Sequence, residues 1–218
     1  MKRLFFVALG FTLLFASCVK KPDEVPTGEA KVRFVNAASG TEAQDMYING
    51  GRFLTQSITY RNFTPYLGYN SGFNFFAFTN TNTEVVNSGV DYASAIDSYT
   101  TIFQYRNLNK AIIADPIPDD MTLPPNGKAR VRFIHLNHFL NNYMRVTAVG
   151  GAEIVPALSF RSASKYFDID PGTKFIASGT GITNAPEVNI NAVAGKIYTV
   201  WFSGETEMEL IPNLLIQN

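Results

Sequence analysis

The chain contains only two histidines, His135 and His138, in the short motif HLNH. Neutral imidazole is a common metal ligand, and Asn137 between them could assist if the chain turned there. A zinc site usually takes three or four protein ligands, and the partners needed to complete one are not evident in the sequence. We therefore predict no metal site and interpret His135 as a polar residue that ends a strand and caps the following loop.

Two other patterns resemble functional sites but lack their companions. The stretch SASK, residues 162–165, has the Ser-x-x-Lys spacing of penicillin-recognising enzymes, which also need a helix start and Ser-Asp-Asn and Lys-Thr-Gly elements. The carboxylates in 168–172 and 115–120 lack the spacing of a calcium loop. We predict no catalytic residues and no cofactor.

Aromatic side chains are the best candidates for ligand binding, because their flat faces stack on sugars or on other rings. Trp201 alternates out of phase with Val200 and Phe202, so one of the two sets faces away from the core. An outward Trp201 would stack either on a ligand or on a second domain. The candidate ligand-binding residues are Trp201, Tyr60, Tyr66 and Tyr166.

The elements that position these residues are predicted to be strands. The chain has 218 residues, is 13% aromatic, and is rich in Val, Ile, Thr and Asn with many Gly and Pro, which favours strands and turns. No window has a sustained apolar pattern at helical spacing, so an all-β fold is expected. Charges are scattered and the net charge is 0, which excludes a basic patch for nucleic acid.

The chain contains an internal repeat in three blocks of constant order. The stretch GEAKVRFVNAA at 28–38 returns as GKARVRFIHLN at 127–137, and ITYRNFTPYLGYNSGF at 58–73 returns as LSFRSASKYFDIDPGT at 158–173. Finally SYTTIF at 98–103 matches IYTVWF at 197–202, which aligns Tyr99 with Tyr198. These matches predict a tandem duplication of a unit of about 90 residues.

Each unit contains several short strands separated by turns, which predicts an immunoglobulin-like β-sandwich; a single barrel built from both halves is the alternative. We expect residues 29–115 to form the first sandwich, the proline-rich residues 116–127 a stiff linker, and residues 128–218 the second sandwich. In the first strand Val32 and Phe34 should face the core, with Lys31 and Arg33 on the other face.

The two repeats resemble a bacterial family of unknown function, number 4397 in the domain-of-unknown-function series. The resemblance lies in the strand VRFVNAASG, the acidic residue and turn in DMYINGG, the turn glycines Gly72 and Gly172, and a closing strand with Tyr-Thr. It implies a secreted or surface-anchored tandem β-sandwich protein and supplies no reaction. Family members usually have His after the first strand, which His135 keeps and Asn36 replaces in the first copy.

The N-terminus has the layout of an export signal. Lys2 and Arg3 precede an apolar run, Leu4 to Ala16, that is too short to cross a bilayer. The residues ending at Cys18, the only cysteine, resemble the lipobox of bacterial lipoproteins. We expect a signal peptide at 1–17 and a lipidated Cys18 with a tether over 18–28; an ordinary cleaved signal is the alternative. Removing residues 1–17 takes away two of the 18 basic residues and none of the 18 acidic ones, which leaves a net charge near −2.

The sequence therefore predicts a lipid-anchored envelope protein without enzymatic activity, attached to the outer membrane. The residues VKKPDE at 19–24 favour the cell surface, and periplasm-facing attachment stays open. The expected partners are the membrane, through the lipid, and a glycan, peptide or envelope protein. The alternatives are an adhesin or fimbrial component that assembles through edge strands, and, less favoured, a hydrolase that uses loops at the sandwich ends.

Overall fold

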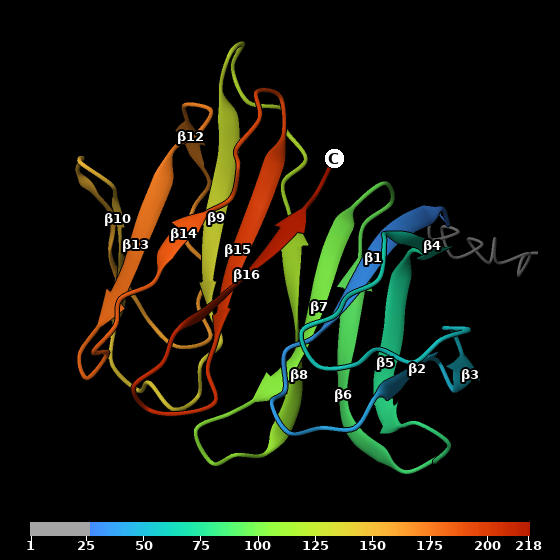
Figure 1. The fold of residues 1–218 in the computed structure, drawn as a ribbon. Coiled ribbons are helices and arrows are strands. Elements are labelled where there is room, and N and C mark those ends of the chain that lie inside the picture. Colours follow the sequence, from blue (N-terminus) through green and yellow to red (C-terminus); the bar gives the residue numbers. More distant parts are fainter. Residues whose placement is uncertain (1–26) are drawn as a thin grey trace, which may run out of the picture.

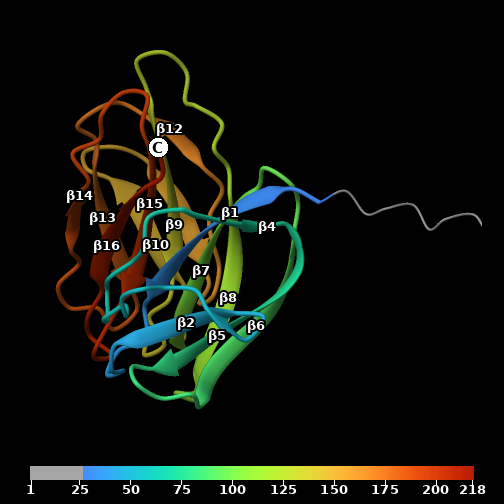
Figure 2. The same cartoon turned by 90° about the vertical axis from the view of Figure 1, so that its right-hand side faces the viewer.

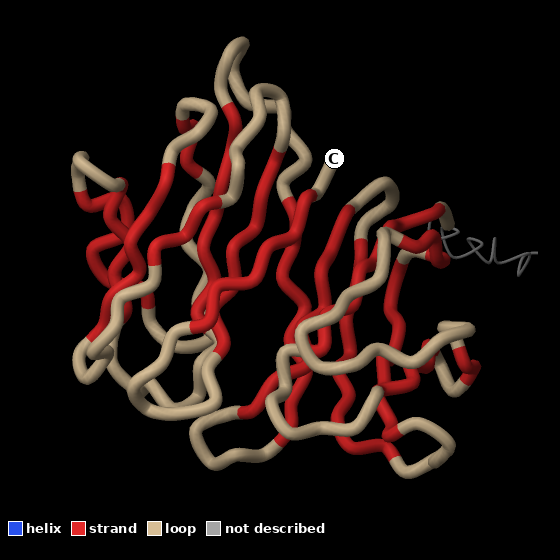
Figure 3. The backbone as a smooth tube through the Cα atoms, in the orientation of Figure 1, coloured by secondary structure: helices blue, strands red, loops and turns tan. Residues whose placement is uncertain are grey.

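The computed structural model describes residues 27–218, so the signal peptide, Cys18 and most of the expected tether lie outside the described residues. The described chain contains 16 strands in four four-stranded sheets and no helix (Figures 1 and 3). Consequently, no helix in residues 27–218 is long and apolar enough to span a membrane. The prediction of an all-β chain with two tandem sandwiches is confirmed, and each half closes its own pair of sheets.

The first sandwich pairs a sheet of order β4-β1-β7-β8 with one of order β3-β2-β5-β6. Its strands are β1 (Glu29–Asn36), β2 (Gln44–Ile48), β3 (Gly51–Arg52), β4 (Leu67–Asn70), β5 (Gly72–Asn80), β6 (Val86–Ser94), β7 (Tyr99–Arg106) and β8 (Ile112–Asp119).

The second sandwich repeats this plan with sheets of order β12-β9-β15-β16 and β11-β10-β13-β14. Its strands are β9 (Ala129–His135), β10 (Met144–Ala148), β11 (Glu153–Leu158), β12 (Phe167–Ile169), β13 (Lys174–Gly179), β14 (Glu187–Asn189), β15 (Ile197–Ser203) and β16 (Ile211–Ile216). In both sandwiches the first strand pairs in parallel with the late strand, β1 with β7 and β9 with β15.

Each sandwich has its own aromatic core, built by the alternation of side chains along the strands. Val32 and Phe34 are fully buried in the first core, where the Phe34 ring lies 5.9 Å from that of Phe78. Phe133 occupies the same place in the second core, 5.1 Å from Phe175. At about 25 cal/mol per Å² of apolar surface, rings of this size dominate the stability of such cores.

The pairing of strands corrects one alignment of the repeats. β1 places Arg33 opposite Thr101, and β9 places the equivalent Arg132 opposite Thr199, so the late strands are offset by 98 positions. Tyr99 therefore corresponds to Ile197, not to Tyr198. Because a slip of one residue exchanges the two faces of a strand, the predicted match would have turned core residues outward.

The expected linker is also partly wrong. Residues 116–119 belong to β8, which pairs antiparallel with β7 along its whole length. Pro116 and Pro118 are two positions apart on the edge strand β8, so their nitrogens face the same side of that strand. Because this is the side away from β7, the missing N–H groups remove no hydrogen bond between β7 and β8. The first sandwich thus extends to Asp119, and the chain crosses to the second sandwich over residues 120–128.

Candidate functional site

The two sandwiches meet through the sheets that contain β1 and β9 (Figures 1 and 2). A third apolar cluster is buried between these sheets. Its buried residues are Val35, Ala37, Phe103, Tyr105, Ile134, Leu136, Trp201 and Leu215. Trp201 is fully buried here, and its ring packs edge-to-face on Phe103 at 6.1 Å between centroids. Of the two alternatives for Trp201, it stacks on the other domain, so it is not available to a ligand.

Two equivalent arginines cross this interface in opposite directions. Arg33 Nη2 donates to the carbonyl oxygen of Ile216 at 2.8 Å, and Arg132 Nη1 donates to that of Pro118 at 2.7 Å. The two acceptors are also 98 positions apart, so the contacts repeat about a pseudo-two-fold axis. The outward position of Arg33 follows the predicted alternation in β1, and burial against the second sandwich leaves it only 4% exposed.

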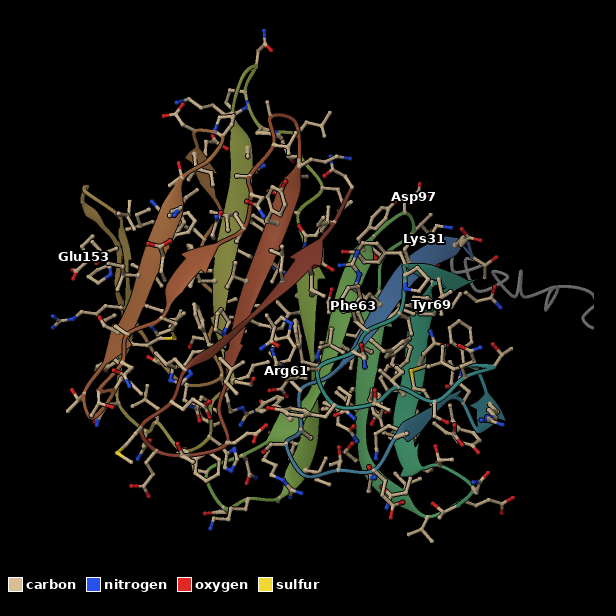
Figure 4. All side chains as sticks on the ribbon, viewed as in Figure 1. Lys31, Arg61, Phe63, Tyr69, Asp97 and Glu153 are labelled. Carbon is tan, nitrogen blue, oxygen red and sulfur yellow. The ribbon has the colours of Figure 1, made fainter. Side chains whose placement is uncertain are left out.

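A second pair of arginines repeats the same relation. Arg61 Nε donates to Asn213 Oδ1 at 2.7 Å, and Arg161 Nη2 pairs with Asp115 Oδ2 at 2.9 Å. Both arginines have left-handed backbone, with φ of 66° and 64°. Figure 4 shows Arg61 and Phe63 on the side of the first sandwich that faces the second. Both pairs of arginines that the two repeats share therefore lie in the interface between them.

Asp119 and Gln217 occupy equivalent positions at the centre of this arrangement and contact each other. Gln217 Nε2 donates to Asp119 Oδ1 at 2.8 Å, and Arg132 forms an ion pair with the same carboxylate. The Asp119 side chain is 0% exposed. Arg33 has Gln217 where Arg132 has Asp119, and its Nε and Nη1 make no hydrogen bond. Two buried arginines thus share one carboxylate, and burial together with the charge of Arg132 lowers the pKa of Arg33.

The three predicted tyrosines also belong to the interface. Tyr66 donates to Asp119 Oδ2 at 2.8 Å under the Arg33 guanidinium, which lies 4.0 Å from its ring centroid. Tyr166 donates to Gln217 Oε1 at 3.0 Å. Burial raises the pKa of Tyr66, Tyr166 and Tyr60 alike. These side chains are partly buried between the sandwiches. Their role as a ligand-binding set stays a prediction.

A groove lies where the interface reaches the loops. The strands β1, β7, β9 and β15 run toward the same end, so the loops that follow them meet there, at the lower edge of Figure 1. The resulting hollow, here called the interdomain groove, has a volume of about 580 Å³. Its lining residues are Ser39, Gly40, Arg106, Lys110, His138, Phe139 and Glu205.

The interdomain groove has a cationic wall. Arg106 is fixed by two carbonyl oxygens, with Nε donating to Ser39 at 2.7 Å and Nη1 to Lys110 at 2.8 Å. Neither Arg106 nor Lys110 forms an ion pair within residues 27–218. His138 is 9% exposed, and its ring packs at a tilt of 36° on that of Phe139, with 4.0 Å between the centroids. Burial, and then the charges of Arg106 and Lys110, lower the pKa of His138, which keeps it neutral at pH 7.

The two histidines have separate roles. His135 is fully buried, its ring contacts Phe160, and its Nδ1 accepts from the backbone N–H of Asn137 at 3.3 Å. The equivalent Asn36 accepts from the N–H of Ala38 at 3.1 Å, so both cap the loop after the first strand, as predicted. Burial lowers the pKa of His135 to about 4. Residues 27–218 hold no cluster of three His, Cys, Asp or Glu suited to a metal ion.

Sequence reasoning missed the interdomain groove. Arg106 and Lys110 lie around an ordinary turn between β7 and β8 and match no motif. His138 was singled out, but only beside His135 as a metal ligand. The sequence offered no signal for this groove, because its walls come from different repeats.

Comparison with known proteins gives a family and a group of distant folds. The family model described as Domain of unknown function (DUF4397) matches residues 30–140. No functionally curated protein matches the chain in sequence. Three solved structures align at low similarity. The Bacillus anthracis TIE protein aligns at 11% identity with a TM-score of 0.25, and the CBM26 module of Eubacterium rectale Amy13K in complex with maltoheptaose aligns at 9% identity with a TM-score of 0.26. A streptococcal virulence factor described as binding alpha-glucan aligns at 11% identity with a TM-score of 0.25.

The alignments cover 82%, 86% and 84% of this chain, and 34%, 95% and 97% of the three structures in the same order. The chain thus spans about a third of the length of the Bacillus protein.

Proposed function

We propose that this chain, which belongs to the family described as Domain of unknown function (DUF4397), is a lipid-anchored envelope protein that binds an anionic ligand in its interdomain groove without transforming it. The observation that carries the proposal is the convergence of Arg106, Lys110 and His138, from both sandwiches, on one hollow. An anion placed there would meet two positive charges and a neutral imidazole, all in a partly desolvated site where such attraction is stronger than in water.

The groove is better suited to binding than to catalysis. Arg106 is held by two backbone carbonyls and presents its remaining nitrogen toward Gly40. His138 packs on Phe139, and no carboxylate of residues 27–218 pairs with it to make it a stronger base. Glu205 is exposed on the rim and is the one acidic residue in the lining. These groups hold and orient an anion, and none is paired as nucleophile and base.

The position of the groove agrees with an anchored protein. Residue 27 leads into β1 at one end of the first sandwich, and the groove lies beyond the other end of β1. Eight residues of strand separate these ends by about 26 Å. The segment that would carry a lipid on Cys18 therefore joins the first sandwich at the end opposite to the groove. Cys18→Ser should release the protein from the membrane fraction and abolish lipid labelling; unchanged fractionation would refute the anchor.

Assembly through edge strands is the alternative, and proline placement disfavours it at three edges. The edge strands β8, β11 and β16 contain Pro116 and Pro118, Pro156, and Pro212 respectively. A proline offers no N–H to an added strand and blunts pairing at that edge.

The binding proposal is tested with the chain lacking residues 1–18, titrated with galacturonate and, as the neutral counterpart, galactose, by NMR chemical shifts. We expect saturable shifts at the groove with galacturonate alone, weakening as salt rises. Lys110→Gln, at an exposed position, should reduce the affinity severalfold, and Glu205→Gln should raise it. Lys174→Gln, an exposed lysine paired with Glu187 on the second sandwich, is the matched control and should change nothing.

Equal response to galactose and galacturonate, or insensitivity to Lys110→Gln, would refute anion binding in the groove. Arg106→Gln is a second variant, and its fold is checked by circular dichroism because Arg106 also binds backbone carbonyls.

A further inference from the structure

A second hollow, here called the Tyr143 groove, lies on the second sandwich and has a volume of about 420 Å³. Its lining residues are Asn142, Tyr143, Arg145, Pro156, Ala157, Ser178, Gly179 and Thr180. Tyr143 is 63% exposed at its edge. The side chains of Asn142, Tyr143 and Arg145 form no hydrogen bond or ion pair with another residue of 27–218, so their polar groups are open to a ligand.

The corresponding surface of the first sandwich is closed by its own side chains. Arg145 pairs with Ser178 across β10 and β13, and Asp45 pairs with Thr79 across β2 and β5. The Asp45 side chain is only 4% exposed, because Arg52 and Ser57 bind its carboxylate at 2.7 and 2.6 Å. The position of Arg145 in the Tyr143 groove is therefore taken in the first repeat by a carboxylate that its own neighbours bind.

One loop, residues 136–143, lines both grooves. His138 and Phe139 face the interdomain groove, and Asn142 and Tyr143 face the second hollow. Phe139 and Asn142 are three residues apart, so their Cα atoms lie within about 11 Å of each other. The two hollows are thus neighbours at the same end of the molecule.

This loop is pinned on both sides. Asn137 is fully buried; its Nδ2 donates to the carbonyl of Glu209 at 2.7 Å and its Oδ1 accepts from the N–H of Phe139 at 2.9 Å. Leu140 is buried against Gly179 of β13, where any Cβ would lie 2.9 Å from Leu140 Cδ2. The relative position of the two grooves is fixed before a ligand arrives, which lowers the entropy cost of filling both.

Building on the proposed anion binding, we propose that the two grooves bind different sugars of one acidic polysaccharide chain. The acid group of one sugar lies against Arg106 and Lys110, and a following sugar ring stacks on Tyr143 with its hydroxyls bonded by Asn142 and Arg145. A peptide adding as a strand is less well served, because Pro156 of the edge strand β11 lines the Tyr143 groove and offers no N–H.

The test is the dependence of affinity on chain length, measured by calorimetry with galacturonate and its oligomers up to the hexamer. For the native protein we expect the affinity to rise about tenfold or more from galacturonate to its hexamer. Tyr143→Ala should remove that gain and leave monomer binding unchanged, while Lys110→Gln should weaken both. Phe73→Ala, which truncates a 73% exposed aromatic on the first sandwich, is the matched control and should behave as the native protein.

Each outcome separates the two proposals. Absence of monomer binding refutes the anion site itself. Monomer binding with no gain on lengthening, or a gain that survives Tyr143→Ala, overturns the two-groove inference alone. A pentaglutamate peptide that binds as tightly as the hexamer, with the same dependence on Tyr143, would overturn the assignment to a polysaccharide.

Discussion

Replacing Asp119 by asparagine tests whether the interface is held by one buried carboxylate. Asn keeps the shape of the side chain but removes the charge that compensates Arg132 and offsets the nearby Arg33. It also places an N–H₂ group among donors, because the carboxylate accepts from Tyr66, Thr101 and Gln217 as well as from Arg132. Removing one partner of a buried ion pair costs about 3–5 kcal/mol, since the other charge is left uncompensated.

For a domain pair of this size, that loss corresponds to a fall of about 6–20 °C in Tm. Urea unfolding followed by circular dichroism gives the free energy of unfolding, and tryptophan fluorescence reports the interface, because Trp201 is the only tryptophan and is buried there. We expect the fluorescence change to occur at the same urea concentration as the loss of strand structure, or below it.

Asp170→Asn is the matched control, because the same chemical change removes an exposed ion pair with Lys128 whose side chains are 75% and 41% exposed. Such pairs contribute about 0–1 kcal/mol. If Asp119→Asn costs no more than Asp170→Asn, the reasoning about the buried network is wrong.

Three further predictions follow from the same physics. Arg132→Met should lower the free energy of unfolding by about 3–5 kcal/mol, because it leaves a buried carboxylate unpaired. Arg33→Met should lower it by at most about 1 kcal/mol, because it removes one hydrogen bond together with a poorly compensated charge. Urea unfolding of the two variants compares these losses. His135 has a pKa of about 4 when folded and about 6.5 when unfolded, so the unfolded chain binds more protons between these values and stability falls as the pH is lowered. The free energy of unfolding of the native protein should therefore drop about 3 kcal/mol more than that of His135→Asn between pH 7 and 4, and equal slopes would contradict it. Gly204→Ala should destabilise by about 1–3 kcal/mol, because the new Cβ would lie 2.2 Å from Asn137 Nδ2, and an unchanged Tm would show that the loop yields.

The fold could be predicted from the sequence where the signal is local. Alternation in the first strand placed Phe34 in the core and Arg33 outside it, and the repeated blocks predicted two sandwiches. The alignment of the late strands was wrong because it matched identical residues, Tyr99 and Tyr198. It did not match residues that face the same side of the sheet. Only the hydrogen-bonded register reveals the offset of 98.

The candidate site could not be predicted because it depends on contacts between the repeats. The alternation around Trp201 predicts that one set of side chains faces away from the core. Which part of the molecule packs on that outward face depends on contacts between residues distant in sequence. The same limit applies to Arg106 and His138, which are distant in sequence and meet only because β1, β7, β9 and β15 end at one level. The sequence predicted a linker at Pro116 and Pro118, but proline fits an edge strand when its nitrogen faces the unpaired side. Which side of β8 is paired follows only from its contact with β7.

The centre of the interface shows an advantage of two fused repeats over two identical chains: equivalent positions can hold different residues, here Asp119 and Gln217. In a symmetric dimer the residue at the two-fold axis meets its own copy. Two aspartates would place carboxylates side by side, and two glutamines would leave both buried arginines uncompensated. The fused chain instead places Gln217 against Asp119, donor to acceptor at 2.8 Å. The same divergence shapes the groove, where Arg106 and Lys110 of the first repeat face His138 and Phe139 of the second. Duplication therefore accounts for the dimer-like interface, and the differences between the copies give the groove one charged and one aromatic wall.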